Sequence, residues 1–264
     1  MYWNAFKDSW KRLFRNPILL LPDFIFFIFF VIGGYSILKS FGILDIFIEK
    51  NTEQLIALLS NFNQLMGLMV SVVIFVIVSF FLGASTLSWK YAMIRNKILN
   101  KKNSLWNDFK EGHKKIKSVI FMKILIFAIA VLALFIGILL VASGKYFGNY
   151  LPSLIVVAIL EMIFFILFYV FIFFRYPIMF FKNYNAVNSL KESFQLGRKR
   201  YDAVIIAALF IIFIGILFSL FINLIGLIKS FVLTQVISAV IGLFIEVWDD
   251  LFLFDIFHRI RKKN

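Results

Sequence analysis

The sequence contains no cysteine and only two histidines, and these absences exclude much of metal and redox chemistry. Without cysteine the chain cannot form disulfides, supply a thiolate nucleophile, hold an iron–sulfur cluster or build most zinc sites. The histidines, His113 and His258, stand in separate basic segments and do not support a histidine-based metal centre. We therefore expect neither a metal nor a cofactor.

The usual sequence motifs of enzymes are also missing. There is no P-loop, no G-x-G-x-x-G, no H-E-x-x-H and no G-x-S-x-G pattern. An enzyme that acts on a lipid stays an alternative, but the nucleophile–base pair or metal-ligand set that it would need is not visible. The sequence thus predicts a protein that is not an enzyme.

Charged residues are scarce for a soluble protein. They make up 16% of the 264 residues, whereas 62% are hydrophobic and the mean hydropathy is +0.94. Soluble domains have about 25% charged and about 45–50% apolar residues. The 36 phenylalanines could not all be buried in a water-soluble core of this size. The lipid bilayer must therefore be part of the solvent.

Six apolar runs are long enough to cross a membrane as helices, since about 20 residues span the hydrocarbon layer. The runs are continuously apolar, without the alternation of a β-barrel, and only helices or closed barrels satisfy their backbone groups in lipid. We expect an all-α integral membrane protein that forms a single membrane domain over residues 1–264. Its six transmembrane helices are predicted at about 18–38, 66–88, 118–141, 153–174, 203–222 and 231–250.

Lysine and arginine are unevenly distributed between the connecting segments. Of the 28 such residues, 23 lie in four segments that the spans place on one side, at 1–17, 89–117, 175–202 and 251–264. By the positive-inside rule this side, which includes both termini, is cytoplasmic. The only sizeable external segment is 39–65, in which Ile43–Leu59 is typical of a helix on the membrane surface.

The net charge of +14 raises the question of a nucleic-acid partner. The basic residues flank the spans, however, and do not form a separate polar domain. Attraction to anionic lipid headgroups on the cytoplasmic face explains them, at about 1 kcal/mol for each residue. We expect membrane lipids as partners, and no nucleic acid.

An internal repeat relates two of the basic segments. When the sequence is shifted by 85 residues, Trp89–Ile116 matches Phe174–Tyr201 with nine identities in 28 positions. The N-terminus follows the same pattern at an offset of 99. The chain is therefore predicted to form three pseudo-repeated hairpins, at about 1–88, 89–174 and 175–264.

Each hairpin is expected to start with an amphipathic helix at the cytoplasmic interface. In the first, aromatic residues such as Trp3 and Trp10 recur at helical spacing, while the basic residues point elsewhere. The aligned asparagines Asn4, Asn103 and Asn188 suit N-caps. These helices fit interfacial anchors, and the alternative is a docking surface for a partner membrane protein.

Two of these segments resemble parts of a broad class of archaeal and bacterial six-span membrane proteins of unknown function. They are Asn4–Pro17 before the first span, and Phe174–Pro177 with Asn188–Gly197 after the fourth. The class includes the membrane domain attached to some glycerophosphodiester phosphodiesterases. The resemblance implies a fold and a membrane location. It implies no active site, since the sequence shows no phosphodiesterase domain.

Charged residues inside the spans are candidates for function, since each costs about 2.5 kcal/mol or more unless it is paired or hydrated. Glu161 lies near the middle of the fourth span, where it would serve a proton or cation pathway or bond to another helix. Asp23 and Lys123 align within one position in the repeat. We expect an ion pair between them; the alternative is that each extends separately to the cytoplasmic surface.

A charge cluster is expected at the cytoplasmic ends of the return spans. Lys90 and Arg175 are equivalent in the repeat, and the sixth span closes with acidic residues at a similar depth, namely Glu246, Asp249 and Asp250. Opposite charges there would lock the hairpins together or line a polar vestibule for a headgroup. A third interpretation is that the acids are ordinary interfacial residues.

The function favoured by these patterns is that of a non-enzymatic protein of the cell membrane that binds or organises lipids or partner proteins. The alternative is a small transporter or permease subunit that uses Glu161. Each predicted hairpin starts on the cytoplasmic side, so the repeats are parallel. Inverted repeats are common in transporters, so a parallel arrangement favours the first function without excluding the second.

Overall fold

The computed structural model describes residues 1–44, 46, 56, 60–101, 104–146, 150–225 and 231–263. These residues form helices and their connections, and no strand occurs among them. The predicted surface helix Ile43–Leu59 falls mostly outside the described residues, and Asn103 lies outside them as well.

The helices are of two kinds, long apolar ones and shorter ones between them. The long helices are α2 (Leu21–Ser40), α5 (Phe62–Ile98), α7 (Ile116–Tyr146), α8 (Tyr150–Phe171), α11 (Tyr201–Ile225) and α12 (Phe231–Lys263). The shorter ones are α1 (Tyr2–Arg15), the 3₁₀ turn η1 (Pro17–Leu20), α6 (Leu105–His113), α9 (Arg175–Phe181) and α10 (Ala186–Lys199).

Five stretches of the described chain are long and apolar enough to cross a membrane. They are Pro17–Ser40, Phe62–Ile98, Ile116–Ser143, Leu151–Phe181 and Tyr201–Ile222. At most 17% of the most apolar part of any of them is buried within the protein, so their side chains face outward, as in a helix surrounded by lipid. These stretches agree with the first five predicted spans. The sixth, at about 231–250, belongs to α12 and stays a prediction.

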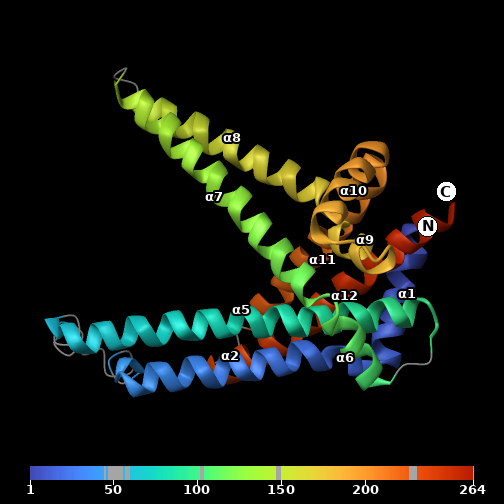
Figure 1. Ribbon diagram of the computed structural model, residues 1–264, viewed down its shortest axis with the longest axis horizontal. Coiled ribbons are helices and arrows are strands. Elements are labelled where there is room, and N and C mark those ends of the chain that lie inside the picture. Colours follow the sequence, from blue (N-terminus) through green and yellow to red (C-terminus); the bar gives the residue numbers. More distant parts are fainter. Residues whose placement is uncertain are drawn as a thin grey trace.

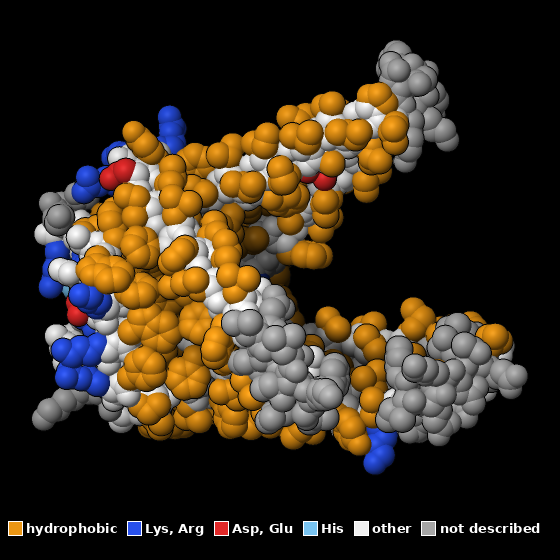
Figure 2. Space-filling view, turned by 180° about the vertical axis from the view of Figure 1, so that it is seen from behind, with side chains coloured by type: hydrophobic (Ala, Val, Ile, Leu, Met, Phe, Trp, Pro, Cys, Tyr) orange, Lys and Arg blue, Asp and Glu red, His pale blue; other side chains and the backbone are white. Residues whose placement is uncertain are grey.

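The long helices form two arms that diverge from a common base (Figure 1). α2 lies along α5 in one arm, and α7 lies along α8 in the other. Both termini are at the base. Lysine and arginine side chains gather at this end, whereas apolar side chains cover the arms, which are separated by a deep hollow (Figure 2). The base is thus the basic end of the molecule.

The buried core lies mainly in this base. α5 and α12 are about 55 and 50 Å long at 1.5 Å per residue. Both are longer than the roughly 30 Å of hydrocarbon in a bilayer. The C-terminal half of α12 supplies fully buried side chains, including Trp248, Phe252 and Ile256. α1, α9 and the last turns of α5 pack around it.

The base differs from the sequence expectation in its local structure. Residues 251–263, expected to be a basic tail, continue α12, and the apolar residues after Arg175 form the buried helix α9. The N-cap of α10 is Asn185, whose side chain accepts a hydrogen bond from the Asn188 amide at 2.9 Å. Asn188 therefore lies inside the helix, because a capping oxygen reaches the amide three residues ahead. Asn4 likewise lies inside α1, whose N-cap is Met1.

Candidate functional site

A buried lysine stands where α2, α5 and α12 meet. The side chain of Lys90, on α5, is 0% exposed. Its Nζ atom is 2.8 Å from Asp250 Oδ2, 2.9 Å from Asp23 Oδ2 and 3.0 Å from Glu246 Oε1. An ammonium group has three N–H donors, and three carboxylates surround this one.

This cluster links segments that are far apart in the sequence. Asp23 comes from the first turn of α2, while Glu246 and Asp250 are four residues apart and so share one face of α12. Removing a charge from water costs several kcal/mol, and the ion pairs with good geometry offset that cost. The cluster therefore fixes α2 and α12 against α5, at the junction between the arms and the base.

Arg175 and Asp249, which were predicted to belong to the cluster, form no ion pair with it in the described residues. The guanidinium of Arg175 lies 4.7 Å from the Tyr176 ring centroid, and its Nη1 donates to the Ile172 carbonyl at 3.1 Å. Asp249 Oδ1 is buried, with no hydrogen-bond partner among the described residues. Lys90 thus gathers Glu246 and Asp250, together with Asp23, which the sequence assigned to another pair.

The predicted ion pair between Asp23 and Lys123 is not formed in the described residues, because Asp23 is paired with Lys90. The Nζ atom of Lys123 instead lies 5.8 Å from the Phe80 ring centroid on α5. Gly83 lies beside it and makes room for the Phe26 ring, since a Cβ atom at position 83 would be only 3.1 Å from that ring, whereas its distance of 3.7 Å from the Lys123 ammonium would be an ordinary contact. Lys123 therefore has no carboxylate within ion-pair distance in the part of the chain that is described.

A cavity of about 690 Å³ lies directly beside the cluster. Its charged and polar lining consists of Asp23, Glu246, Lys123, Ser79 and Thr86. The rest is apolar and mainly aromatic, from Phe26, Phe30, Phe75, Val76, Phe80, Gly83 and Leu87. The cavity therefore has polar and charged groups from four helices and walls of phenylalanine.

Two polar groups of this cavity are not fully satisfied by the described residues. The Glu246 side chain is 58% exposed even though it contacts Lys90. Ser79 Oγ is buried and has no hydrogen-bond partner among the described residues, which is costly unless something else bonds to it. Thr86 differs, because its hydroxyl donates to the Leu82 carbonyl at 3.1 Å.

Glu161 lies apart from the cluster, between α7 and α8 in the other arm. Its carboxyl group covers Gly137, so closely that a Cβ atom there would overlap Oε1. Glu161 lines two grooves of about 350 and 490 Å³, whose other lining residues are all apolar or glycine. The structure gives Glu161 no ion pair or hydrogen bond with another described residue. It does not bring Glu161 to Asp23 or Lys123.

A second set of buried charges was missed by the sequence analysis. Asp255, 1% exposed on α12, accepts from Arg12 Nη1 at 2.6 Å and from Arg259 Nε at 2.7 Å. Arg259 also pairs with Asp8 on α1. The spacing of Asp255 and Arg259, four residues apart, was a visible signal for half of this network. The partners on α1 are more than 240 residues away in the chain, so only the fold brings them together.

No family model matches this sequence, and the comparisons with curated proteins and with solved structures found no match either.

Proposed function

We propose that the protein is a non-enzymatic, multi-pass membrane protein that binds a lipid in the cavity beside Lys90. The observation that carries this proposal is the combination of an uncommitted cation, a half-exposed carboxylate and aromatic walls in one space of about 690 Å³. Ligand sites are mostly apolar and contain a few convergent polar groups, with volumes of about 300–1,000 Å³. The cavity has this character.

The charges of the cavity suit a zwitterionic headgroup. Lys123 would bind a phosphate, since no described carboxylate neutralises it. Glu246 would accept hydrogen bonds from an ammonium group, because more than half of its side chain is exposed. A headgroup that carries both charges satisfies Lys123 and Glu246 at once, which neither a purely anionic nor an uncharged headgroup does.

The apolar part of the cavity would receive the acyl chains. Phe26 and Phe30 on α2 face Phe75 and Phe80 on α5, and all four line the space. The hollow between the two arms, visible in Figure 2, offers the remaining chain length a route into the surrounding bilayer. The lipid would thus stand between the arms, with its headgroup at their base.

The position of Glu161 favours lipid binding over the alternative of ion transport. A proton or cation pathway needs polar groups on both sides of an intramembrane acid. The grooves at Glu161 are lined by residues such as Leu132, Ile136, Val157 and Leu160. The charged cavity at Asp23 does not include Glu161.

For this function we propose a topology of six membrane spans, in which the base and both termini lie on the cytoplasmic side of the cell membrane. Support comes from the lysine and arginine residues at the base and from the positive-inside rule. Anionic headgroups would contact this face, and a partner membrane protein could do so as well. The repeat and the resemblance to six-span prokaryotic membrane proteins fit the same arrangement. Because the chain has no cysteine, single cysteines at Lys191 and at Ser60, in the predicted external segment 39–65, would test the orientation by labelling with an impermeant maleimide.

The lipid site is tested by native mass spectrometry of the full chain after exchange into defined lipids. The protein is expected to retain phosphatidylethanolamine in preference to phosphatidylglycerol. Val76 lines the cavity and is 58% exposed, whereas Val73 on the same helix is 54% exposed and does not line it. Val76→Trp is expected to reduce retention about tenfold, by loss of about 1.4 kcal/mol of binding free energy, and Val73→Trp is the matched control.

A second variant tests the headgroup contact. Lys123→Gln removes the cation and is expected to abolish the preference for a phosphate-bearing lipid over a diacylglycerol. If Val76→Trp and Val73→Trp retain lipid equally, or if Lys123→Gln leaves the preference unchanged, the cavity is not the binding site. A proton or cation flux in proteoliposomes that Glu161→Gln abolishes would support the transporter instead.

A further inference from the structure

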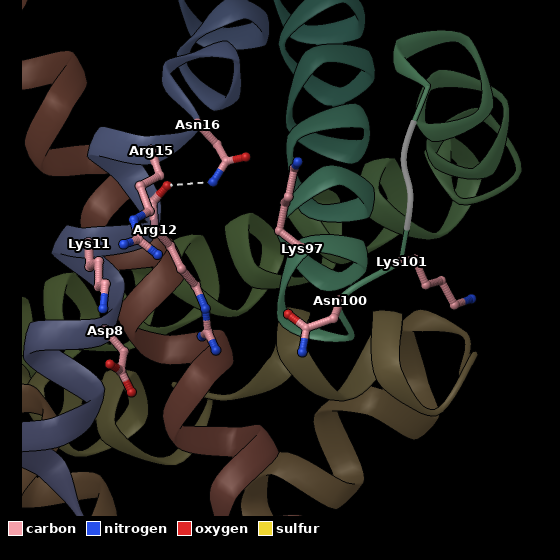
Figure 3. A pocket seen from close by; sticks show the side chains of 8 residues that line it. All are labelled: Asp8, Lys11, Arg12, Arg15, Asn16, Lys97, Asn100 and Lys101. Carbon is pink, nitrogen blue, oxygen red and sulfur yellow. Dashed lines mark hydrogen bonds between the residues drawn. The ribbon is translucent and has the colours of Figure 1, made fainter.

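A second pocket, of about 790 Å³, opens at the base between α1 and the C-terminal end of α5. Figure 3 shows α1 and α5 on its two sides, with Arg12 and Arg15 projecting from one and Lys97 and Asn100 from the other. The lining residues are Asp8, Lys11, Arg12, Arg15, Asn16, Lys97, Asn100 and Lys101. Five of these eight side chains are cationic, and one is acidic.

The single carboxylate in this pocket is already neutralised. Asp8 pairs with Arg259, and Arg12 pairs with the buried Asp255, both residues of α12. These contacts hold the α1 wall in place, so the pocket does not have to be ordered by a ligand. Four cations remain without an ion pair to any described residue, namely Lys11, Arg15, Lys97 and Lys101.

A purely structural role does not account for these four cations. Basic residues stabilise the C-terminal ends of helices, and both α1 and α5 end at the pocket. Each helix end corresponds to about half a negative charge, so two ends require about one cation, whereas four unpaired ones are present. The surplus would repel itself in the absence of a counter-ion.

The repeat gives an independent comparison. Lys97 aligns with Lys182, which forms an ion pair with Glu192. The position that aligns with Glu192 is Asn107. The corresponding lysine of the other copy is thus neutralised within the protein, whereas Lys97 is left to face the pocket.

We propose that this pocket binds a ligand with a multiply charged phosphate group. Arginine and lysine are the usual partners of phosphate, as a bidentate fork and as a point charge respectively. Lys11, Arg15 and Lys97 supply the uncommitted charges, and the side chain of Asn100 adds a neutral donor. A single negative charge would leave most of the surplus uncompensated, so the ligand is a phosphomonoester or a polyphosphate.

The phosphate can come from a lipid headgroup or from a soluble compound. Asn16 directly precedes Pro17, the first residue of a candidate span, so one rim of the pocket lies at the membrane surface. Lys11, Arg15 and Lys101 are exposed to water, so the pocket is open to the aqueous side as well. The same cations serve both sources, and the experiment separates them.

Binding is measured with two probes on the full chain. The soluble probe is inorganic triphosphate, titrated calorimetrically against the protein in a neutral detergent. The lipid probe is phosphatidic acid in phosphatidylcholine nanodiscs, followed by native mass spectrometry. A triple variant, with Lys11, Arg15 and Lys97 each changed to Gln, is expected to lose at least about tenfold in affinity for whichever probe binds, since each charge-assisted hydrogen bond contributes roughly a factor of ten.

The control is Lys191→Gln, which removes an exposed lysine from α10, outside the pocket. This variant is expected to leave the affinity unchanged. Higher salt is expected to weaken binding to the original chain, because it screens the charges of the pocket. If the protein binds triphosphate and only the triple variant loses this binding, the ligand is a soluble phosphate compound. If instead only the triple variant loses the binding of phosphatidic acid, the ligand is a lipid headgroup. If the original chain binds neither probe, or if the triple variant and Lys191→Gln behave alike, the proposal is wrong. These residues do not line the cavity beside Lys90, so failure here leaves the lipid site untouched.

Discussion

The Nζ atom of Lys90 lies 2.9 Å from Asp23 Oδ2, in a contact between α5 and α2 that is almost completely shielded from water. Because α12 adds Glu246 and Asp250 to the same ammonium, one side chain holds three long helices at the point where the arms meet the base. Asp23 and Glu246 of this cluster also line the proposed lipid cavity. We therefore expect the stability of the protein and the proposed lipid binding to depend on the same charge cluster.

Replacing Lys90 by methionine is expected to destabilise the protein by about 3–5 kcal/mol, because the buried carboxylates lose their counter-charge. The measurement is thermal or denaturant unfolding in detergent. Adding Asp23→Asn and Asp250→Asn to Lys90→Met removes the unpaired charges and is expected to restore much of the stability. A triple variant no more stable than Lys90→Met would contradict this account of the cluster.

The attachment of α1 to α12 is predicted to depend on Asp255. Asp255→Ala removes two charge-assisted bonds, from Arg12 and Arg259, and is expected to cost about 2–3 kcal/mol. Hydrogen exchange in α1 should become faster, since the helix loses its anchor. Glu161→Gln changes an acid of α8 that has no ion pair or hydrogen bond with another described residue, and it is expected to alter neither quantity. If the rate of hydrogen exchange in α1 is the same in Asp255→Ala as in the original chain, the prediction is wrong.

Close packing at Gly112 provides a third prediction. A Cβ atom there would lie 2.8 Å from the Ser88 carbonyl oxygen and from Trp89 Cα, which are backbone atoms of α5. Gly112→Ala must therefore shift α6 away from α5, at a cost of about 1–3 kcal/mol in the free energy of unfolding. Gly34→Ala is the control, because a Cβ atom there meets nothing within 4 Å. Equal melting temperatures for the two variants would show that the approach is not tight.

His258 makes the base sensitive to acid. Its pKa lies below the ordinary value of 6.5, because burial disfavours the cation and because Lys262 repels it. Since the unfolded chain binds the proton more readily, stability is expected to fall as the pH drops through about 6.5 and to level off below the folded pKa. Melting temperatures between pH 7.5 and 5.5 should therefore decline a little less in His258→Phe than in the original chain. His113→Phe controls for loss of an imidazole, and a decline that His258→Phe leaves unaltered refutes this origin.

For Glu161, the apolar surroundings predict that the acid contributes no stability. Glu161→Leu removes a polar group from grooves lined by apolar residues, and it is expected to leave the melting temperature unchanged or to raise it. Retention of lipid in the cavity beside Lys90 should stay the same, because Glu161 does not line it. A clear loss of stability would mean that Glu161 bonds to another group and has a structural role.

The long helices were predictable, because runs of about 20 apolar residues leave few alternatives. The first five predicted spans correspond to stretches that the structure also identifies. Their ends were less predictable. α5 runs to Ile98 and α12 to Lys263, since a helix that leaves the membrane continues as long as the base offers it a surface to pack on. The burial of Tyr176 and Phe180 in α9 could not be predicted from the sequence, because a short apolar stretch after a span does not indicate what it packs against.

For the candidate site, the sequence alone showed which charged residues belong near the membrane and at what approximate depth in it they lie. Hydropathy places Asp23, Lys90, Lys123 and Glu246 inside or at the ends of apolar runs, and depth along a helix follows from residue number alone. Which charge meets which was decided only by the tertiary structure. Repeat equivalence pointed Asp23 toward Lys123, whereas the packing of α2 and α12 on α5 brings it to Lys90. An ion pair depends on how the helices pack and rotate against one another, and this depends on contacts along their whole length rather than on any local pattern.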